Sequence, residues 1–237
     1  MTYSRPSMNG EGHEGLDELE TYLTTAEVLT WGEAVMEGGH PEKHRIILAG
    51  GVQVMAKPGF DQHEDTVKRE VAGWHVAKHV GFTGLVAATV LREVPRLSTG
   101  EPVLSSVQVT WPDGRQWLTP IDQFTEEETW RAAVFDAIVA HTDHRGNNWF
   151  GVPDPTTGRQ PHLRLVDTGN AFTGNQPSSS FYERHIDEEL PTDVTDGLQR
   201  LLEDWPVELE DLLAATDADR IRSRAEELLT AGLLRIG

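Results

Sequence analysis

Two polar segments constrain this chain more than any other feature, AHTDHRGNNWF at 140–150 and HLRLVDTGNAF at 162–172. The first places Asp143 five residues ahead of Asn148. The second places Asp167 at the end of an apolar run, in an Asp-x-Gly sequence. One carboxylate can orient an attacking hydroxyl, while an amide oxygen and a second carboxylate can hold Mg²⁺ against nucleotide phosphates. The spacing therefore fits the transfer of a phosphoryl group to a hydroxyl.

A helix is predicted immediately before Asp143. The sequence TEEE at Thr125–Glu128 has the form of a capping box, in which the threonine caps and the glutamate reaches back. Apolar residues then recur at helical spacing up to His141. This predicts Asp143 on a loop anchored by a rigid element, as a catalytic group requires. Asp136 lies inside the helix, and we expect it to make a helix-to-loop hydrogen bond.

Three histidines, His141, His144 and His162, invite interpretation as a metal site. They share no helix face, and the chain contains no cysteine that could complete a zinc site. The sequence therefore disfavours zinc.

The N-terminal part predicts a three-stranded meander over 29–36, 45–49 and 52–57. Its first turn contains Gly38 and Gly39 in GGHPEK. That turn is either an ordinary hairpin or a loop whose backbone N–H groups contact phosphates. Without a GxGxxG sequence, the turn alone favours the hairpin.

Lys57 closes the third strand, and a predicted helix follows it. Glu70 lies beside the apolar stripe of that helix, next to Val67, Val71 and Trp74, so it should point towards the sheet. A strand lysine paired with a helix glutamate is the ion pair that holds a kinase lysine against the α- and β-phosphates. The alternative for both side chains is a solvated surface position.

Two further strands, at 86–94 and 103–111, complete a predicted sheet of about five strands with one helix after the third. In a kinase the last strand leads to backbone groups that pair with adenine, here near Val109. Amphipathic segments at 181–190, 196–205 and 218–234 predict a mostly helical C-terminal third.

Composition limits the partners of this 237-residue chain. It has 20 Lys and Arg against 39 Asp and Glu, a formal net charge of −19. Such a charge repels nucleic acid and anionic membranes, so neither is an expected partner. The absence of cysteine excludes disulfide and thiol chemistry. No segment resembles a signal peptide or a membrane span, so a cytoplasmic location is expected.

The chain resembles the kinase-like superfamily that includes HipA-type kinases and the catalytic domains of phosphatidylinositol 3- and 4-kinases. It is most similar to small actinobacterial phosphatidylinositol kinase-like proteins. The segments that carry the resemblance are MAKPG, KREVAGWHVAKHVGF, AATVLREVP, VFDAIVAHTDHRGNN and LVDTGNAF. They lie within 29–172, and it is their order and spacing together that make the match specific.

This resemblance implies an α+β, bilobal protein-kinase-like fold with a cleft between the lobes. Residues 1–15 would be a disordered tail, 16–111 an N-terminal lobe with an antiparallel sheet and one helix, and 112–237 a helical C-terminal lobe.

The resemblance also implies roles for single residues, and an ATP- and Mg²⁺-dependent kinase. Lys57 would contact the nucleotide phosphates with Glu70 as its partner, and Asp143 would be the catalytic base. Asn148 and Asp167 would be the metal ligands. The acceptor hydroxyl would belong to a protein Ser or Thr or to a small metabolite, and the acidic charge disfavours a lipid.

Two departures from the family pattern leave alternatives open. The family has Asp-Arg-His in the catalytic loop, whereas this chain has Asp143-His144-Arg145, and GGHPEK replaces a Ser/Asn-rich loop. A pseudokinase that binds nucleotide or a partner without turnover, and transfer of AMP on the same fold, are the alternative functions.

Overall fold

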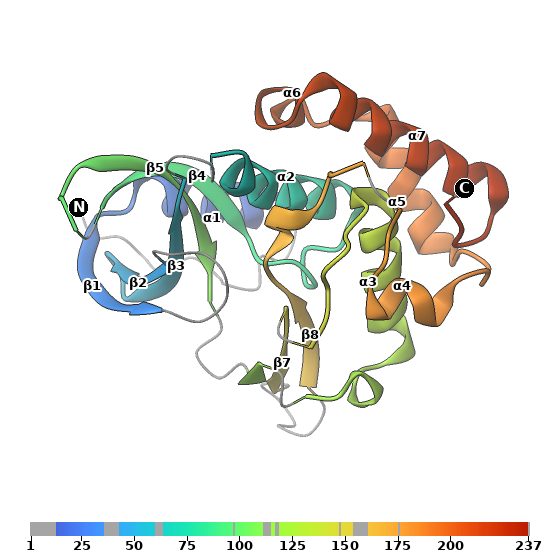
Figure 1. The fold of residues 1–237 in the computed structure, drawn as a ribbon, viewed down its shortest axis with the longest axis horizontal. Coiled ribbons are helices and arrows are strands. Elements are labelled where there is room, and N and C mark those ends of the chain that lie inside the picture. The colour runs from blue at the N-terminus through green and yellow to red at the C-terminus, as the bar shows by residue number, and fades with distance from the viewer. Residues whose placement is uncertain are drawn as a thin grey trace. The chain divides into compact units, whose positions relative to one another are not determined.

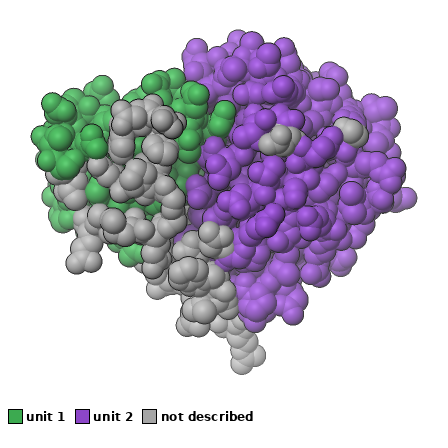
Figure 2. All heavy atoms as spheres, in the orientation of Figure 1, with its two compact units in different colours: residues 1–71, 87–112 green, residues 72–86, 113–237 purple. Residues whose placement is uncertain are grey.

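The computed structural model describes residues 13–35, 43–59, 64–96, 98–110, 115–116, 119–146, 148–153, 161–174 and 176–236. The fold is α+β, with an N-terminal antiparallel sheet and a mostly helical C-terminal part, as the sequence predicted. The chain forms two compact units (Figure 2), unit 1 from residues 1–71 with 87–112 and unit 2 from 72–86 with 113–237. The predicted lobe boundary at 111/112 lies one residue from a unit boundary, although 72–86 pack with unit 2.

Unit 1 is built on a five-stranded antiparallel sheet in the order β1-β2-β3-β5-β4 (Figure 1). Its strands are β1 (Val28–Val35), β2 (Lys43–Leu48), β3 (Val52–Pro58), β4 (Thr89–Pro95) and β5 (Pro102–Val109). Alternate residues of β2 are buried, because successive side chains of a strand point to opposite faces. This confirms the predicted sheet, with one helix inserted after the third strand.

Unit 1 also contains α1 (His13–Thr25) and the first residues of α2 (Glu64–Val80), whose residues 72–80 belong to unit 2. The predicted tail over 1–15 is wrong in its last residues, since α1 begins at His13. A first helical turn needs no intrahelical partners for its N–H groups, so polar residues can begin a helix ahead of its apolar stripe. The Arg92 guanidinium of β4 donates to the carbonyl oxygens of Leu23 and Ala26, both at 2.9 Å, and thereby caps the end of α1.

The predicted strand at 86–94 is wrong at its start. β4 begins at Thr89, whereas Val86 forms an isolated parallel bridge with Leu165 of unit 2. The backbone N–H of Leu165 also donates to the Leu85 carbonyl at 2.8 Å. An apolar run by itself cannot show which sheet its residues pair with, because that pairing is decided by distant partners.

Unit 2 contains α3 (Glu126–Val139) and a three-stranded antiparallel sheet of β6 (Arg115–Gln116), β7 (Trp149–Pro153) and β8 (Pro161–Leu165). Four helices follow, α4 (Ser180–His185), α5 (Thr192–Glu203), α6 (Glu208–Leu212) and α7 (Ala215–Ala231). The core of the unit is apolar and gathers around α3, of which nearly every residue from Thr129 to Val139 is buried. The sequence did not predict β6, β7 or α6, which are all short.

Some predictions fall outside the described residues, namely those for 1–12, Met36, Gly38, Gly39, Trp111 and Pro112. Within the described part of the chain, no helix combines the length and the apolar character needed to cross a membrane.

Candidate functional site

The predicted site residues lie in both units. Lys57 and Glu70 belong to unit 1, whereas Asp143, Asn148 and Asp167 belong to unit 2. In each unit these residues are held by contacts within that unit.

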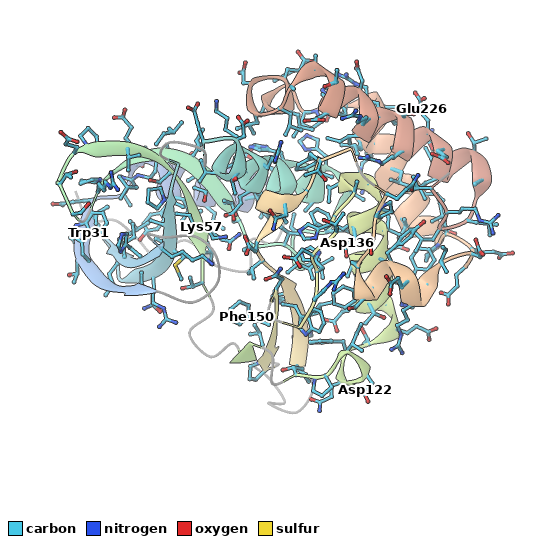
Figure 3. All side chains as sticks on the ribbon, in the orientation of Figure 1. Trp31, Lys57, Asp122, Asp136, Phe150 and Glu226 are labelled. Atoms are coloured by element: carbon cyan, nitrogen blue, oxygen red, sulfur yellow. The ribbon has the colours of Figure 1, made fainter. Side chains whose placement is uncertain are left out.

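The predicted site residues of unit 1 form a buried ion pair. The Lys57 ammonium of β3, labelled in Figure 3, donates to Oε1 of Glu70 on α2, which confirms the predicted pair. The second carboxylate oxygen of Glu70 accepts a hydrogen bond from Ser106 Oγ at 3.1 Å. Ser106 lies directly across from Lys57 in the β3–β5 pairing. The sequence analysis did not identify Ser106, because its position opposite Lys57 depends on the strand order.

The ion pair between Lys57 and Glu70 is buried, and burial of charges is energetically unfavourable. Lys57 is 5% exposed and Glu70 is 1% exposed. The free energy needed to remove two charges from water can exceed the free energy gained from their attraction. A fold that needed only stability could place apolar side chains here instead. Stability alone therefore does not explain the pair.

Val109, predicted to contact adenine, is buried at the end of β5. Its backbone N–H donates to the Ala88 carbonyl at 3.0 Å. An adenine contact at Val109 stays a prediction, and it would not use this N–H group.

In unit 2, α3 positions the loop that carries Asp143. The predicted capping box is confirmed, since Thr125 Oγ1 accepts from the Glu128 N–H at 3.1 Å and Glu128 Oε2 accepts from the Thr125 N–H at 3.3 Å. The other carboxylate oxygen of Glu128 accepts from the Leu163 N–H at 3.1 Å. One side chain therefore begins α3 and also anchors β8, the strand that leads to Asp167. At its other end, α3 stops at Ala140 in the left-handed conformation.

Asn148 holds the loop that begins at Asp143. Its Nδ2 donates to the Asp143 backbone carbonyl at 2.5 Å and to the Asp143 carboxylate at 3.3 Å. The Asn148 N–H donates to the Arg145 carbonyl at 2.8 Å, and its own carbonyl accepts from Val166 at 3.1 Å. The five-residue spacing thus closes a compact loop. Asn148 is buried, whereas Asp143 is half-buried and Arg145 is exposed.

His141 connects this loop to the residue that follows β8. Its Nδ1 accepts from the Asp143 N–H and its Nε2 donates to the Asp167 carbonyl, both at 3.1 Å. An amide N–H can only donate and a carbonyl can only accept, so these partners specify a neutral imidazole with its proton on Nε2. Burial, and next the adjacent His144, lower the pKa of His141 to about 4. The neutral ring is therefore the stable form at neutral pH.

His144 points into the core, where its Nδ1 contacts Oδ1 of Asp136 on α3 (Asp136 is labelled in Figure 3). This is the helix-to-loop hydrogen bond predicted for Asp136. The rings of His141 and His144 stack at 3.6 Å with 7° between their planes. These three side chains lie close enough to hold a cation. However, both nitrogens of His141 already have partners, and the in-plane lone pairs of parallel rings do not converge on one point.

Asp167 follows β8 in the left-handed region, with φ of 66°. A short 3-10 turn, Thr168–Asn170, comes next and is closed by the Ala171 N–H donating to the Thr168 carbonyl at 3.0 Å. Phe172, also left-handed, donates its N–H to the Val139 carbonyl at 2.7 Å. The turn is therefore tied to the end of α3 on one side and to His141 on the other.

The segment after this turn is hydrogen-bonded to the loop that carries Asp143. The N–H of Ser178 donates to the His141 carbonyl at 3.1 Å, and that of Ser180 to the His144 carbonyl at 3.3 Å. Ser179 is buried and caps α4 by accepting from the Tyr182 N–H. The three serines at 178–180 therefore help to hold the start of α4 against the loop that carries Asp143.

The donor atoms in unit 2 fit a hard divalent cation. Because Nδ2 of Asn148 already donates to Asp143, the amide is oriented with its oxygen as the remaining ligand atom. Carboxylate and amide oxygens are the ligands that Mg²⁺ and Mn²⁺ take in proteins. The fit rests on the orientation of Asn148 and on the chemistry of Asp167.

Comparisons with known proteins identify the type of fold. No protein-family model matches the chain, and no curated protein matches its sequence. Among solved structures, a Golgi casein kinase with Mn/ADP bound is 14% identical, with a TM-score of 0.61 over 93% of this chain and 76% of that one. The structure of hydra Fam20 with sugar is 10% identical, with a TM-score of 0.67 over 97% of this chain and 91% of that one. The fold is kinase-like.

Sequence reasoning missed residues that position the site without being polar ligands themselves. Gly73 of α2 has no room for a side chain, because a Cβ there would lie 2.7 Å from Thr168 Oγ1. His141 was noticed only as a possible metal ligand, although its place two residues before Asp143 could have indicated a role in orienting the loop.

Proposed function

We propose that this chain is an ATP- and Mg²⁺-dependent phosphotransferase that moves the γ-phosphoryl group to a hydroxyl. The observation that carries the proposal is the tie between the loops of Asp143 and Asp167, made by Asn148 and His141 within unit 2. The fixed Lys57 ammonium in unit 1 supports it. A kinase-like fold alone would not support a particular activity, because one fold hosts many functions.

Each site residue has a proposed role. The Asp143 carboxylate accepts the proton of the attacking hydroxyl, and the Asn148 amide oxygen and the Asp167 carboxylate hold the metal. Lys57 binds the nucleotide phosphates, with Glu70 fixing its ammonium. Bound Mg²⁺ supplies charge neutralisation between the phosphates. The Mn/ADP of the Golgi casein kinase supports a divalent metal and a nucleotide here.

In this arrangement the protein contributes position and charge. Phosphoryl transfer asks little covalent chemistry of side chains, so most catalysis comes from holding the acceptor, the phosphates and compensating charges in place. Neutral His141 serves this end, because it fixes the backbone on both sides of the site without adding a charge. The proposed acceptor is a hydroxyl of a protein or a small molecule. The better-known substrates of the family that the chain resembles are proteins or lipids, and the net charge of −19 disfavours an anionic lipid.

Calorimetry with Mg²⁺-ATP tests the proposal. Wild type should bind in a Mg²⁺-dependent way, and Asp167→Ala should lose that dependence. Asp143→Ala should retain binding but abolish turnover, because the base takes no part in holding the nucleotide. Normal turnover by Asp143→Ala, or no Mg²⁺-dependent binding by wild type, would contradict it. Mass spectrometry of the acceptor then separates a phosphoryl from an adenylyl product.

A further inference from the structure

Gly73 of α2 packs tightly against Thr168, in the turn that begins with Asp167. A Cβ on Gly73 would meet three side-chain atoms of Thr168, with Oγ1 at 2.7 Å, Cβ at 3.0 Å and Cγ2 at 3.3 Å. Thr168 is the residue directly after Asp167 and is 1% exposed. Both residues belong to unit 2. The helix therefore sits directly against the turn that begins with Asp167.

Thr168 cannot avoid an added methyl group by rotating its side chain. It is branched at Cβ, so its χ1 angle has few allowed values in a packed site. Rotation also leaves its own Cβ in place, at 3.0 Å from the added atom. Relief must therefore come from the backbone of Thr168 or from α2.

α2 is held in place at the end of its unit 2 part. A Cβ on Gly197 of α5 would lie 2.3 Å from the Val80 carbonyl oxygen, so the two helices meet backbone to backbone. The Arg200 guanidinium donates to the same oxygen at 3.3 Å. Ala72, Trp74, Val76 and Ala77, which surround Gly73 in sequence, are all buried. A side chain at position 73 would therefore displace the turn that begins with Asp167, and not α2.

A displacement of Thr168 acts on Asp167 first. The Asp167 carbonyl is held by His141 and the Phe172 N–H by Val139, so the ends of the turn are fixed. The change falls on the dihedral angles that flank the Asp167 carbonyl, including those of Asp167 itself, whose left-handed conformation is unfavourable for a residue with a Cβ. The direction of the Asp167 carboxylate follows these angles.

We propose that Gly73 and Thr168 form a positioning pair, in which the bare backbone of Gly73 seats Thr168 and so sets the direction of the Asp167 carboxylate towards the metal. The inference rests on the proposed function, in which Asp167 is a metal ligand. Neither residue touches the metal or substrate. Their effect passes through the backbone of Asp167.

The test compares Gly73→Ala, Thr168→Ala and the double variant with wild type. Gly84→Ala is the matched control, because a Cβ there meets nothing within 4 Å and Gly84 lies in the same unit. Titration with Mn²⁺-ADP should show Gly73→Ala weakened by about 10- to 100-fold, the range for residues that orient metal ligands. The double variant should recover part of this loss, because Thr168→Ala removes the atoms at 2.7 and 3.3 Å and leaves only the Cβ contact at 3.0 Å, and Gly84→Ala should match wild type.

Amide hydrogen exchange gives a readout that needs no ligand. Gly73→Ala should speed exchange in peptides covering 167–172, and adding Thr168→Ala should lessen that effect, because it removes Oγ1 and Cγ2 from the contact. Wild-type affinity in Gly73→Ala, no rescue in the double variant, or faster exchange across the whole of unit 2 would each overturn the proposal. If wild type itself binds no Mn²⁺-ADP, the proposed function fails, and exchange at 167–172 still decides whether the pair controls the turn.

Discussion

Lowering the pH should destabilise this protein through His141 in particular. The buried, neutral ring has a pKa of about 4, against an ordinary value of 6.5. Its Nδ1 accepts from the Asp143 N–H, so a proton on that nitrogen breaks the bond. Acid should therefore weaken the tie between the loops of Asp143 and Asp167.

The sign and size of this pH effect on the free energy of unfolding follow from proton linkage. Between pH 6.5 and 4 the unfolded chain carries a proton on His141 and the folded chain does not, so the free energy of unfolding falls as the pH falls. The contribution is fully present above pH 6.5 and is lost by about pH 4. A difference of 2.5 pH units, at about 1.4 kcal/mol each, corresponds to about 3 kcal/mol. That is a large part of a typical domain stability of roughly 5–15 kcal/mol.

Urea unfolding of wild type and His141→Gln between pH 7.5 and 4 measures this contribution. Glutamine offers an amide in place of the ring but does not titrate. Over this pH range the free energy of unfolding of His141→Gln should therefore fall by about 3 kcal/mol less than that of wild type. His79→Gln, at a half-exposed position on α2, is the control for removing a histidine, and it should follow wild type. Parallel pH curves for wild type and His141→Gln would refute the reasoning.

Three further predictions test the surrounding structure by denaturant unfolding. Glu70→Gln should lower the free energy of unfolding by about 3–5 kcal/mol, since it leaves the Lys57 ammonium buried without its counter-charge. Combining Lys57→Met with Glu70→Leu should recover much of that stability, and an equal loss in this double variant would contradict the reasoning. Arg92→Gln should cost roughly 1–3 kcal/mol by uncapping α1, with hydrogen exchange rising first in that helix; unchanged exchange there would count against the cap. Glu128→Ala should cost roughly 1–2 kcal/mol and weaken Mg²⁺-ATP binding, whereas unaltered binding would show that its tie to β8 does not reach Asp167.

The polar positions of the candidate site could be predicted from sequence because their spacing is local. The capping box at Thr125–Glu128, the helix that ends before Asp143, and the loop from Asp143 to Asn148 each depend on residues within a few positions of one another. Hydrogen bonds of this kind are encoded in short segments. The strand of Lys57 and the inward side of Glu70 followed in the same way, from alternation and from helical periodicity.

What holds those positions in place was decided by the tertiary structure. Ser106 meets Glu70 because β5 lies beside β3 in the sheet, and Val86 pairs with Leu165 instead of extending β4. Gly73 is restrictive only because Thr168 packs against it, 95 positions along the chain. Such contacts depend on strand order and on helix docking, which no local pattern contains, because the free energy of burial is set by whichever distant surface covers a residue.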